Sequence, residues 1–180
     1  MNTADDTQLI AAAQAGDTAS FGVLYDEYIE PVYRFVYFKT HHKETAEDLT
    51  SFIFLKALEQ LSSFHPQKGP FRAWLYTIAR NTITDHYRRE SKKRHMPIED
   101  AWELPSSYNT SSSVENRLCI ERLREWTKDF SAVERDVLML RIWQGLSHKE
   151  IAAAIGKTET NCKQIYSRAI EKLKYRIHTI

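Results

Sequence analysis

Residues 131–177 read SAVERDVLMLRIWQGLSHKEIAAAIGKTETNCKQIYSRAIEKLKYRI, and this stretch decides the fold of the C-terminal part of the chain. Ser131 is followed three residues later by Glu134, and Ser147 is followed in the same way by Glu150. A hydroxyl and a carboxylate at this spacing form a capping box, in which each side chain satisfies a free backbone N–H group. Two helices are therefore expected to begin within 20 residues of each other.

Glycine and threonine mark the remaining boundaries of this stretch. Gly145 and Gly156 predict two sharp turns, because glycine readily adopts the left-handed backbone that ends a helix. Thr158 is expected to cap a last helix, whose inner face carries Cys162 and four other residues spaced by three or four. These are Ile165, Tyr166, Ala169 and Leu173. Two helices joined by a short turn that contains glycine predict a helix-turn-helix.

The outward face of the last helix has the chemistry of a DNA reader. In a helix-turn-helix the second helix enters the major groove, where amides pair with adenine, carboxylates with cytosine, and Arg or Lys with guanine or phosphate. The outward positions expected here are Glu159, Asn161, Lys163, Gln164, Ser167, Arg168 and Lys172. The alternative is a plain helical hairpin with a solvated face.

Helical periodicity also dominates the N-terminal part, and alternating strand patterns are nearly absent. The expected elements are a helix ending near Gly16, a second beginning at Asp17 or Thr18, a third capped by Thr45, a loop at 65–70 and a fourth helix from 71 to about 91. Pro31 falls inside the second helix and predicts a kink or a division there.

The character of the chain changes at about residue 92. Prolines and a serine-rich run up to residue 113 lack any helical stripe, which is typical of a flexible linker. The predicted organisation is a domain at 1–94, a linker at 95–113 and a second domain at 114–180, whose first helix runs from 114 to 128. The fold class is all-α, with two small helical domains, the C-terminal one a helix-turn-helix.

The net charge of +1 hides an uneven distribution. Residues 71–94 and 141–180 each carry a net charge of +5, whereas the segments 1–70 and 95–140 are acidic. Two separate basic blocks favour two contacts with a polyanion such as DNA, although solvated helix faces would show the same pattern. The two cysteines form no metal motif, and no signal peptide or long apolar run occurs, so a reduced cytoplasmic setting without membrane insertion is expected.

Three segments together resemble a known family. They are the helix-turn-helix, residues 46–57 (AEDLTSFIFLKA) and residues 64–89 (FHPQKGPFRAWLYTIARNTITDHYRR). Their sequence and order are similar to those of the extracytoplasmic-function group of bacterial RNA polymerase sigma factors. The resemblance implies two partners, core RNA polymerase (through its beta-prime clamp and beta flap) and promoter DNA. It also implies control by an anti-sigma factor, and neither a cofactor, a small-molecule substrate nor enzymatic activity.

The resemblance assigns recognition of the minus-thirty-five element to the outward positions of the last helix, with Thr158 added. It assigns recognition and melting of the minus-ten element to the loop 62–69 and the basic helix after it. Melting requires a base to leave the stack and be held by the protein. The residues implied are Ser63, Phe64, His65, Lys68, Phe71, Arg72, Arg80, Asn81, Asp85, Arg88 and Arg89. Phe64 and Phe71 are open between base platforms and core residues, whereas Trp74 is expected in the core.

The resemblance assigns polymerase binding to the helix that starts near Thr45. Acidic residues would pair with basic clamp residues, and exposed apolar residues would fill the centre of the interface. The residues implied are Glu47, Asp48, Leu49, Phe52, Phe54 and Leu55. A plain amphipathic core helix is the alternative for most of its leucines.

Four positions depart from the family pattern: Phe52 replaces an acidic residue, Thr160 a glycine, Cys162 a valine and Ile165 an arginine. The loss of an arginine at 165 removes an expected phosphate contact.

Rival functions make different demands on the sequence. A conventional regulator would need a ligand pocket and usually a dimer interface in its first domain, and residues 1–94 suggest neither. A nucleic-acid enzyme would need a carboxylate cluster, a P-loop or a metal set, and no such motif occurs. A polymerase-binding adaptor or anti-sigma protein is disfavoured because both basic blocks are present.

Overall fold

The computed structural model describes residues 3–94, 122–123 and 125–178, and every regular element within them is a helix. The chain divides into two compact units, residues 1–108 and 109–180. The predicted all-α class with two helical domains is confirmed. The predicted linker at 95–113 and most of the predicted helix at 114–128 lie outside the described residues.

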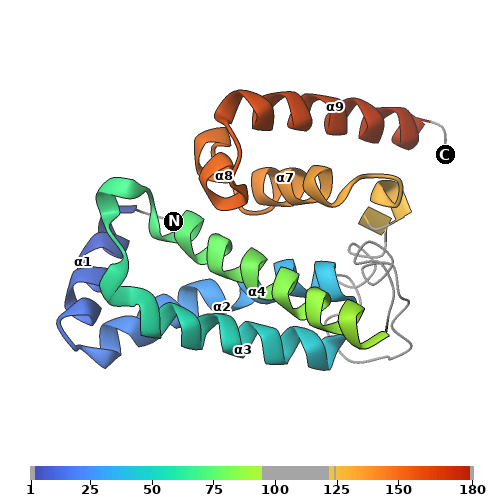
Figure 1. Ribbon diagram of the computed structural model, residues 1–180. Coiled ribbons are helices and arrows are strands. Elements are labelled where there is room, and N and C mark those ends of the chain that lie inside the picture. The colour runs from blue at the N-terminus through green and yellow to red at the C-terminus, as the bar shows by residue number, and fades with distance from the viewer. Residues whose placement is uncertain (1–2, 95–121, 124, 179–180) are drawn as a thin grey trace. The chain divides into compact units, whose positions relative to one another are not determined.

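Among its described residues, unit 1 contains four α-helices and two short 3-10 helices (Figure 1). They are α1 (Thr3–Gln14), α2 (Thr18–Thr40), α3 (Lys43–Gln60), η1 (Leu61–Ser63), η2 (Pro66–Lys68) and α4 (Phe71–Arg94). The loop predicted at 65–70 thus contains one 3-10 turn, η2. Helix α4 continues to Arg94, past its predicted end at about residue 91. The side chain of Asp17 caps α2 by accepting from the Ala19 N–H, as predicted.

Helix α2 is continuous through Pro31. The proline removes one backbone hydrogen bond, but it does not divide the helix. Val32, Phe35 and Val36, on the turn that follows, are completely buried. Their packing holds this segment helical, which local sequence preference alone does not do.

The N-terminus of α3 differs from the prediction. His42, not Thr45, is the N-cap, and its Nδ1 accepts a hydrogen bond from the Thr45 backbone N–H at 3.2 Å. His41 ends α2 with a left-handed backbone, φ 52°. The prediction of a Thr45 cap was wrong because a histidine ring nitrogen here performs the task usually given to Ser, Thr, Asp or Asn.

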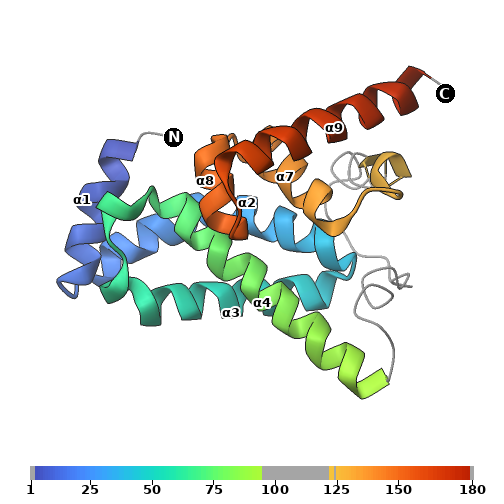
Figure 2. The ribbon, with the colours of Figure 1, turned by 45° about the horizontal axis from the view of Figure 1, so that its top comes forward.

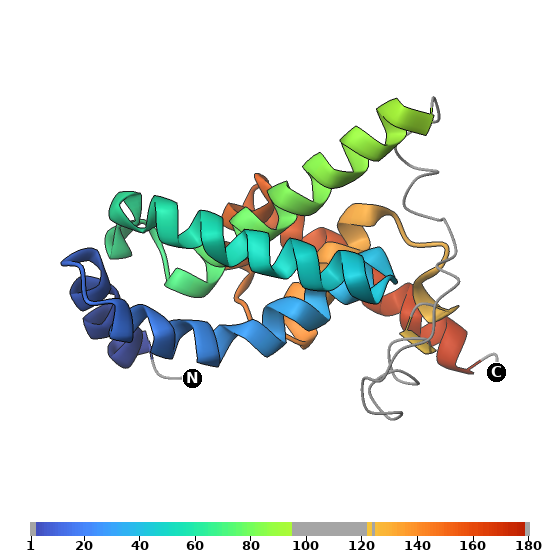
Figure 3. The ribbon, with the colours of Figure 1, turned by 90° about the horizontal axis from the view of Figure 1, so that it is seen from below.

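The core of unit 1 lies where α2, α3 and α4 pack together (Figures 2 and 3). The Phe35 and Tyr76 rings meet edge to face at 5.3 Å between centroids. Helix α1 is attached to α2 by a buried hydrogen bond of 2.6 Å from the Tyr28 hydroxyl to Asp6. Burial and the Asp6 carboxylate both raise the pKa of Tyr28 above its ordinary value, so this hydroxyl remains a proton donor.

Unit 2 contains α7 (Ala132–Ile142), α8 (His148–Ile155) and α9 (Glu159–His178). Both predicted capping boxes are formed, at Ser131 and at Ser147. Gly156 has the predicted left-handed backbone, φ 67°, between α8 and α9. Thr158 caps α9, because its Oγ1 accepts from the Asn161 N–H at 3.2 Å. The predicted helix-turn-helix is therefore confirmed.

Helix α9 packs against both α7 and α8. Cys162 and Ala169 on its inner face are fully buried, and Phe130 and Leu138 form a cluster with Ala169. Tyr166, Ile170 and Leu173 pack against this cluster while they remain partly exposed. Burial raises the pKa of the Cys162 thiol, so that this cysteine behaves as an apolar core residue.

Candidate DNA and polymerase interfaces

The outward face of α9 is exposed along its length. All of the predicted minus-thirty-five residues are exposed: Thr158, Glu159, Asn161, Lys163, Gln164, Ser167, Arg168 and Lys172. Lys163 and Glu159 form an ion pair of 2.7 Å along the helix, and Lys163 lowers the pKa of Glu159. A pair this exposed is weak, so both side chains remain available to a ligand.

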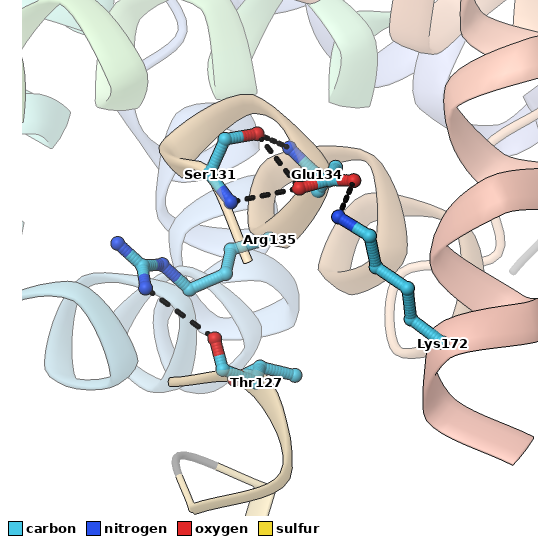
Figure 4. Close-up of polar contacts among 5 residues, drawn as sticks. All are labelled: Thr127, Ser131, Glu134, Arg135 and Lys172. Carbon is cyan, nitrogen blue, oxygen red and sulfur yellow. Dashed lines mark hydrogen bonds and ion pairs between the residues drawn. The ribbon is translucent and has the colours of Figure 1, made fainter. Parts of the chain in front are cut away.

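Lys172 is directed differently from its neighbours. Its Nζ lies 2.6 Å from Glu134 Oε1 on α7 (Figure 4). The same Nζ lies 5.5 Å from the centroid of the Phe130 ring. Burial alone would raise the pKa of Glu134, but hydrogen bonds from Lys172 and Ser131 bring that pKa below its ordinary value. The capping-box glutamate thus connects the start of α7 with α9, and Lys172 is engaged within unit 2.

An open groove lies between the start of α7 and the outer side of α9. Its lining combines apolar, acidic and basic side chains from Ser131, Val133, Glu134, Lys157, Ile165 and Arg168. The half-buried Ile165, which stands where the family usually has arginine, lines this groove together with Val133. Its side chain is therefore positioned for apolar contact, and Arg168, three residues further along α9, lines the same groove.

His148 is the first residue of α8 and packs against α9. Its ring meets the Tyr166 ring edge to face at 5.3 Å. Its Nε2 is buried and has no hydrogen-bond partner. Burial lowers the pKa of His148, and the positive charges of Arg141 and Lys163 lower it further. The neutral imidazole is thus the form that this junction accommodates.

The aromatic residues around the predicted minus-ten loop form one cluster. The Phe64, Phe71 and Trp74 ring centroids lie between 5.3 and 5.7 Å from one another. Phe64 is 4% exposed and Phe71 is 2% exposed, while Trp74 is partly buried. This burial favours the core role for the two phenylalanines, which then support the loop from beneath.

The polar residues of the loop point outward. Ser63, His65 and Lys68 are exposed, and Arg72 in the first turn of α4 is half-buried. The Ser63 hydroxyl donates to the Gln60 carbonyl at 2.7 Å. The loop therefore exposes a positive charge and hydrogen-bonding groups. The aromatic cluster of Phe64, Phe71 and Trp74 supports it from beneath.

Helix α4 carries the remaining predicted minus-ten residues. Asn81, Arg88 and Arg89 are exposed, whereas Arg80 and Asp85 are half-buried. Arg88 forms a 3.2 Å ion pair with Asp85, and Arg89 Nε donates to the Asp85 carbonyl. These contacts orient two arginines along one side of α4.

The predicted polymerase residues on α3 separate into two groups. Glu47, Asp48, Phe52 and Leu55 are exposed, with Phe52 at 40% and Leu55 at 50%. Leu49 and Phe54 are buried, at 7% and 4%, so they hold the helix in place from inside. Leu58, which is not among the predicted polymerase residues, is 48% exposed and lies one turn beyond Leu55. The i, i+3 spacing of the two leucines was the available signal.

Comparison with known proteins identifies both units. A family model of sigma-70 region 2 matches residues 24–93, and one of sigma-70 region 4 matches residues 131–173. The ECF RNA polymerase sigma factor BldN of Streptomyces coelicolor is 37% identical over 171 residues, which cover 92% of this chain and 63% of that protein. The RNA polymerase sigma factor YlaC of Bacillus subtilis is 34% identical over 158 residues, which cover 84% of this chain and 88% of that protein.

Solved structures show the same fold. CnrH, in complex with the cytosolic domain of CnrY, superposes with a TM-score of 0.75 at 22% identity, covering 97% of this chain and 98% of that one. The sigma factor RpoE, in complex with the anti-sigma factor NepR from Bartonella quintana, gives a TM-score of 0.73 at 22% identity, covering 88% and 96%.

A helix-turn-helix unit preceded by a helical unit of the region 2 type defines a bacterial transcription initiation factor. The chain belongs to the sigma-70 family of RNA polymerase sigma factors, in its extracytoplasmic-function group. This is a family of initiation factors rather than of enzymes. Among the described residues, no group of His, Cys, Asp and Glu side chains could hold a metal ion. No helix in the described part of the chain is long and apolar enough to cross a membrane.

Proposed function

We propose that this protein directs core RNA polymerase to promoters by reading a minus-thirty-five element with α9 and by reading and melting a minus-ten element with the loop 62–69 and α4. The observation that carries the proposal is the match of both units, in order, to sigma-70 regions 2 and 4. Its action on polymerase and chromosome would take place in the cytoplasm.

The upstream element would be read by the N-terminal half of α9. Amide and basic side chains at Asn161, Lys163, Gln164 and Arg168 are exposed and spaced to follow base edges in the major groove. Lys172 would contribute through its contact with Glu134 and not through a direct base contact.

The downstream element would be held by unit 1. An extruded base needs a pocket that replaces its stacking and hydrogen bonds. The exposed loop residues His65 and Lys68 would contact the unpaired strand, with the basic side of α4 beside it as a track for phosphates. The buried Phe64 and Phe71 would give this surface rigidity.

Helix α3 would supply the polymerase interface. Its exposed acidic residues, Glu47 and Asp48, would pair with basic residues of the beta-prime clamp. Its exposed apolar residues, Phe52, Leu55 and Leu58, would form the buried centre. Unit 2 would contact the beta flap. The exposed Phe52 adds an aromatic group where the family usually has an acidic one.

Control by an anti-sigma factor is the second part of the proposal. RpoE was crystallised with the anti-sigma factor NepR. A partner that covers the exposed apolar residues of α3 would compete with polymerase for the same surface. Pull-down of the tagged chain with and without added core polymerase tests this competition, and a partner whose retention does not depend on polymerase would contradict it.

The test of the proposed function is transcription in vitro from genomic fragments, using core polymerase with and without this protein. Discrete start sites that depend on the protein are the expected result, and their upstream sequences define both elements. Tight binding to DNA without any protein-dependent transcript would instead point to a conventional regulator.

A further inference from the structure

The amide of Gln14 joins the end of α1 to the start of the loop 62–69. Its Nε2 donates to the Leu61 carbonyl at 2.8 Å and to the Phe64 carbonyl at 2.9 Å, residues 47 and 50 positions away in the sequence. A primary amide has two N–H groups, so one Gln14 side chain satisfies both carbonyls. Figures 1 and 2 show α1 beside the connection between α3 and α4.

These two carbonyls lie where the chain leaves α3. The Leu61 carbonyl also accepts the Phe64 N–H at 3.0 Å, which closes the 3-10 turn η1. Phe64 then adopts an extended backbone, φ −73° and ψ 132°, with its ring buried against Phe71 and Trp74. Gln14 therefore fixes both ends of the short segment from which the loop emerges.

The four residues after Phe64 are less buried than Phe64 itself. His65, Pro66, Gln67 and Lys68 are all exposed, and η2 is closed by the Lys68 and Gly69 N–H groups. Because little else restrains this tip, its direction depends on the carbonyl geometry at Leu61 and Phe64.

We propose that Gln14 is a positioning residue for discrimination at the minus-ten element. Through its two hydrogen bonds, α1 holds the loop 62–69 in the conformation that accepts one extruded base and rejects others. This inference rests on the proposed function of the loop. Gln14 lies outside residues 24–93, the part of unit 1 that the region 2 family model matches.

The position suits a clean test because Gln14 is itself an exposed residue, and its replacement leaves no cavity in the core. Gln14→Glu keeps the shape of the side chain but replaces the amide N–H donors by a carboxylate that faces the two carbonyl oxygens of Leu61 and Phe64. Gln14→Ala removes the side chain without adding charge. Gln8→Glu is the matched control, because Gln8 is an exposed glutamine on the same helix and the substitution changes the charge identically.

The experiment uses the full chain with core polymerase on the promoter mapped by transcription in vitro. Promoter opening is measured by permanganate reactivity on templates that carry each of the four bases at the extruded position. For Gln14→Glu and Gln14→Ala we expect the preference for the favoured base to fall by about 3- to 10-fold, the range of one or two modest hydrogen bonds. Core binding and upstream DNA affinity should remain those of the wild type, the melting temperature should fall by no more than the loss of two hydrogen bonds explains, and Gln8→Glu should keep full preference.

A base preference that is unchanged in both Gln14 variants overturns the inference. So does a uniform loss of opening on all four templates, because that result indicates a general structural role. If the wild-type protein itself opens no promoter, the proposed function fails, and this outcome is distinguishable from failure of the Gln14 assignment.

Discussion

Lys172 shows why a position on a helix face does not by itself identify a DNA contact. It lies on the same outward side of α9 as Arg168, and the sequence predicts the same role for both. Arg168 is exposed and lines an open groove, whereas Lys172 is paired with Glu134 and lies over the Phe130 ring. The difference comes from α7, whose capping-box glutamate, Glu134, forms an ion pair with Lys172.

The two residues should therefore respond differently to substitution. Arg168→Ala should weaken binding to the upstream element by roughly 1–3 kcal/mol if the side chain reads a base. Lys172→Ala should lower the free energy of unfolding by about 0.5–1 kcal/mol and weaken DNA binding less. Fluorescence anisotropy on a promoter duplex and denaturant unfolding measure the two effects. An equal loss of DNA affinity in both variants would contradict the assignment of Lys172.

His148 predicts a pH dependence of unit 2. Its pKa in the folded protein is below the ordinary value of about 6.5 that the unfolded chain has, so the unfolded state binds more protons in that window. The free energy of unfolding should fall as the pH drops from about 6.5 towards the lowered pKa and then stop changing. His148→Gln should flatten this dependence. His65→Gln, in an exposed loop, serves as the control and should leave the slope intact; a slope that survives in His148→Gln would assign it to other groups.

At the scale of elements, α3 combines a buried side and an exposed side that have different purposes. Leu49 and Phe54 face the core, while Leu55 and Leu58 are about half exposed. A helix whose only purpose was to complete the core would not need a row of exposed apolar residues beside acidic ones. This exposed apolar row is the part of α3 that we propose as the contact with core polymerase.

This division predicts opposite consequences for two leucines of α3. Leu55→Ala should leave the free energy of unfolding nearly unchanged but lower the affinity for core polymerase. Leu49→Ala should lower the free energy of unfolding by about 2–5 kcal/mol, because it leaves a cavity. Core affinity is measured by competition with a labelled sigma factor, and stability by thermal denaturation. If Leu55→Ala bound core polymerase as tightly as the wild type, the assignment of α3 as the polymerase interface would be wrong.

Elements also show where sequence reasoning succeeds. The boundaries of α7, α8 and α9 follow from caps and glycines, which act over three or four residues and can be read locally. The His42 cap and the continuity of α2 through Pro31 could not be predicted, because each depends on tertiary packing or on an uncommon capping residue. The contact of Tyr28 with Phe71 and the hydrogen bonds of Gln14 to the Leu61 and Phe64 carbonyls join distant segments, and no periodicity shows such contacts.

The whole molecule combines two units of different chemistry in one chain. The predicted fold class, all-α with a C-terminal helix-turn-helix, follows from helical periodicity and capping motifs and is confirmed. The family was also predictable, because its motifs are contiguous in the sequence. The roles of individual surface residues could be predicted only in part, because the exposure and ion pairing of each side chain depend on neighbours from other helices.

The most direct test of the central claim is run-off transcription from a mapped promoter, comparing the wild type with Asn81→Ala and Arg168→Ala. Wild-type protein with core polymerase should open the DNA around the start site and produce a discrete transcript. Arg168→Ala should reduce occupancy of the upstream element, whereas Asn81→Ala should bind core normally but open less DNA, as measured by permanganate. A wild-type protein that gives no transcript above core polymerase alone, on any genomic fragment, would contradict the account.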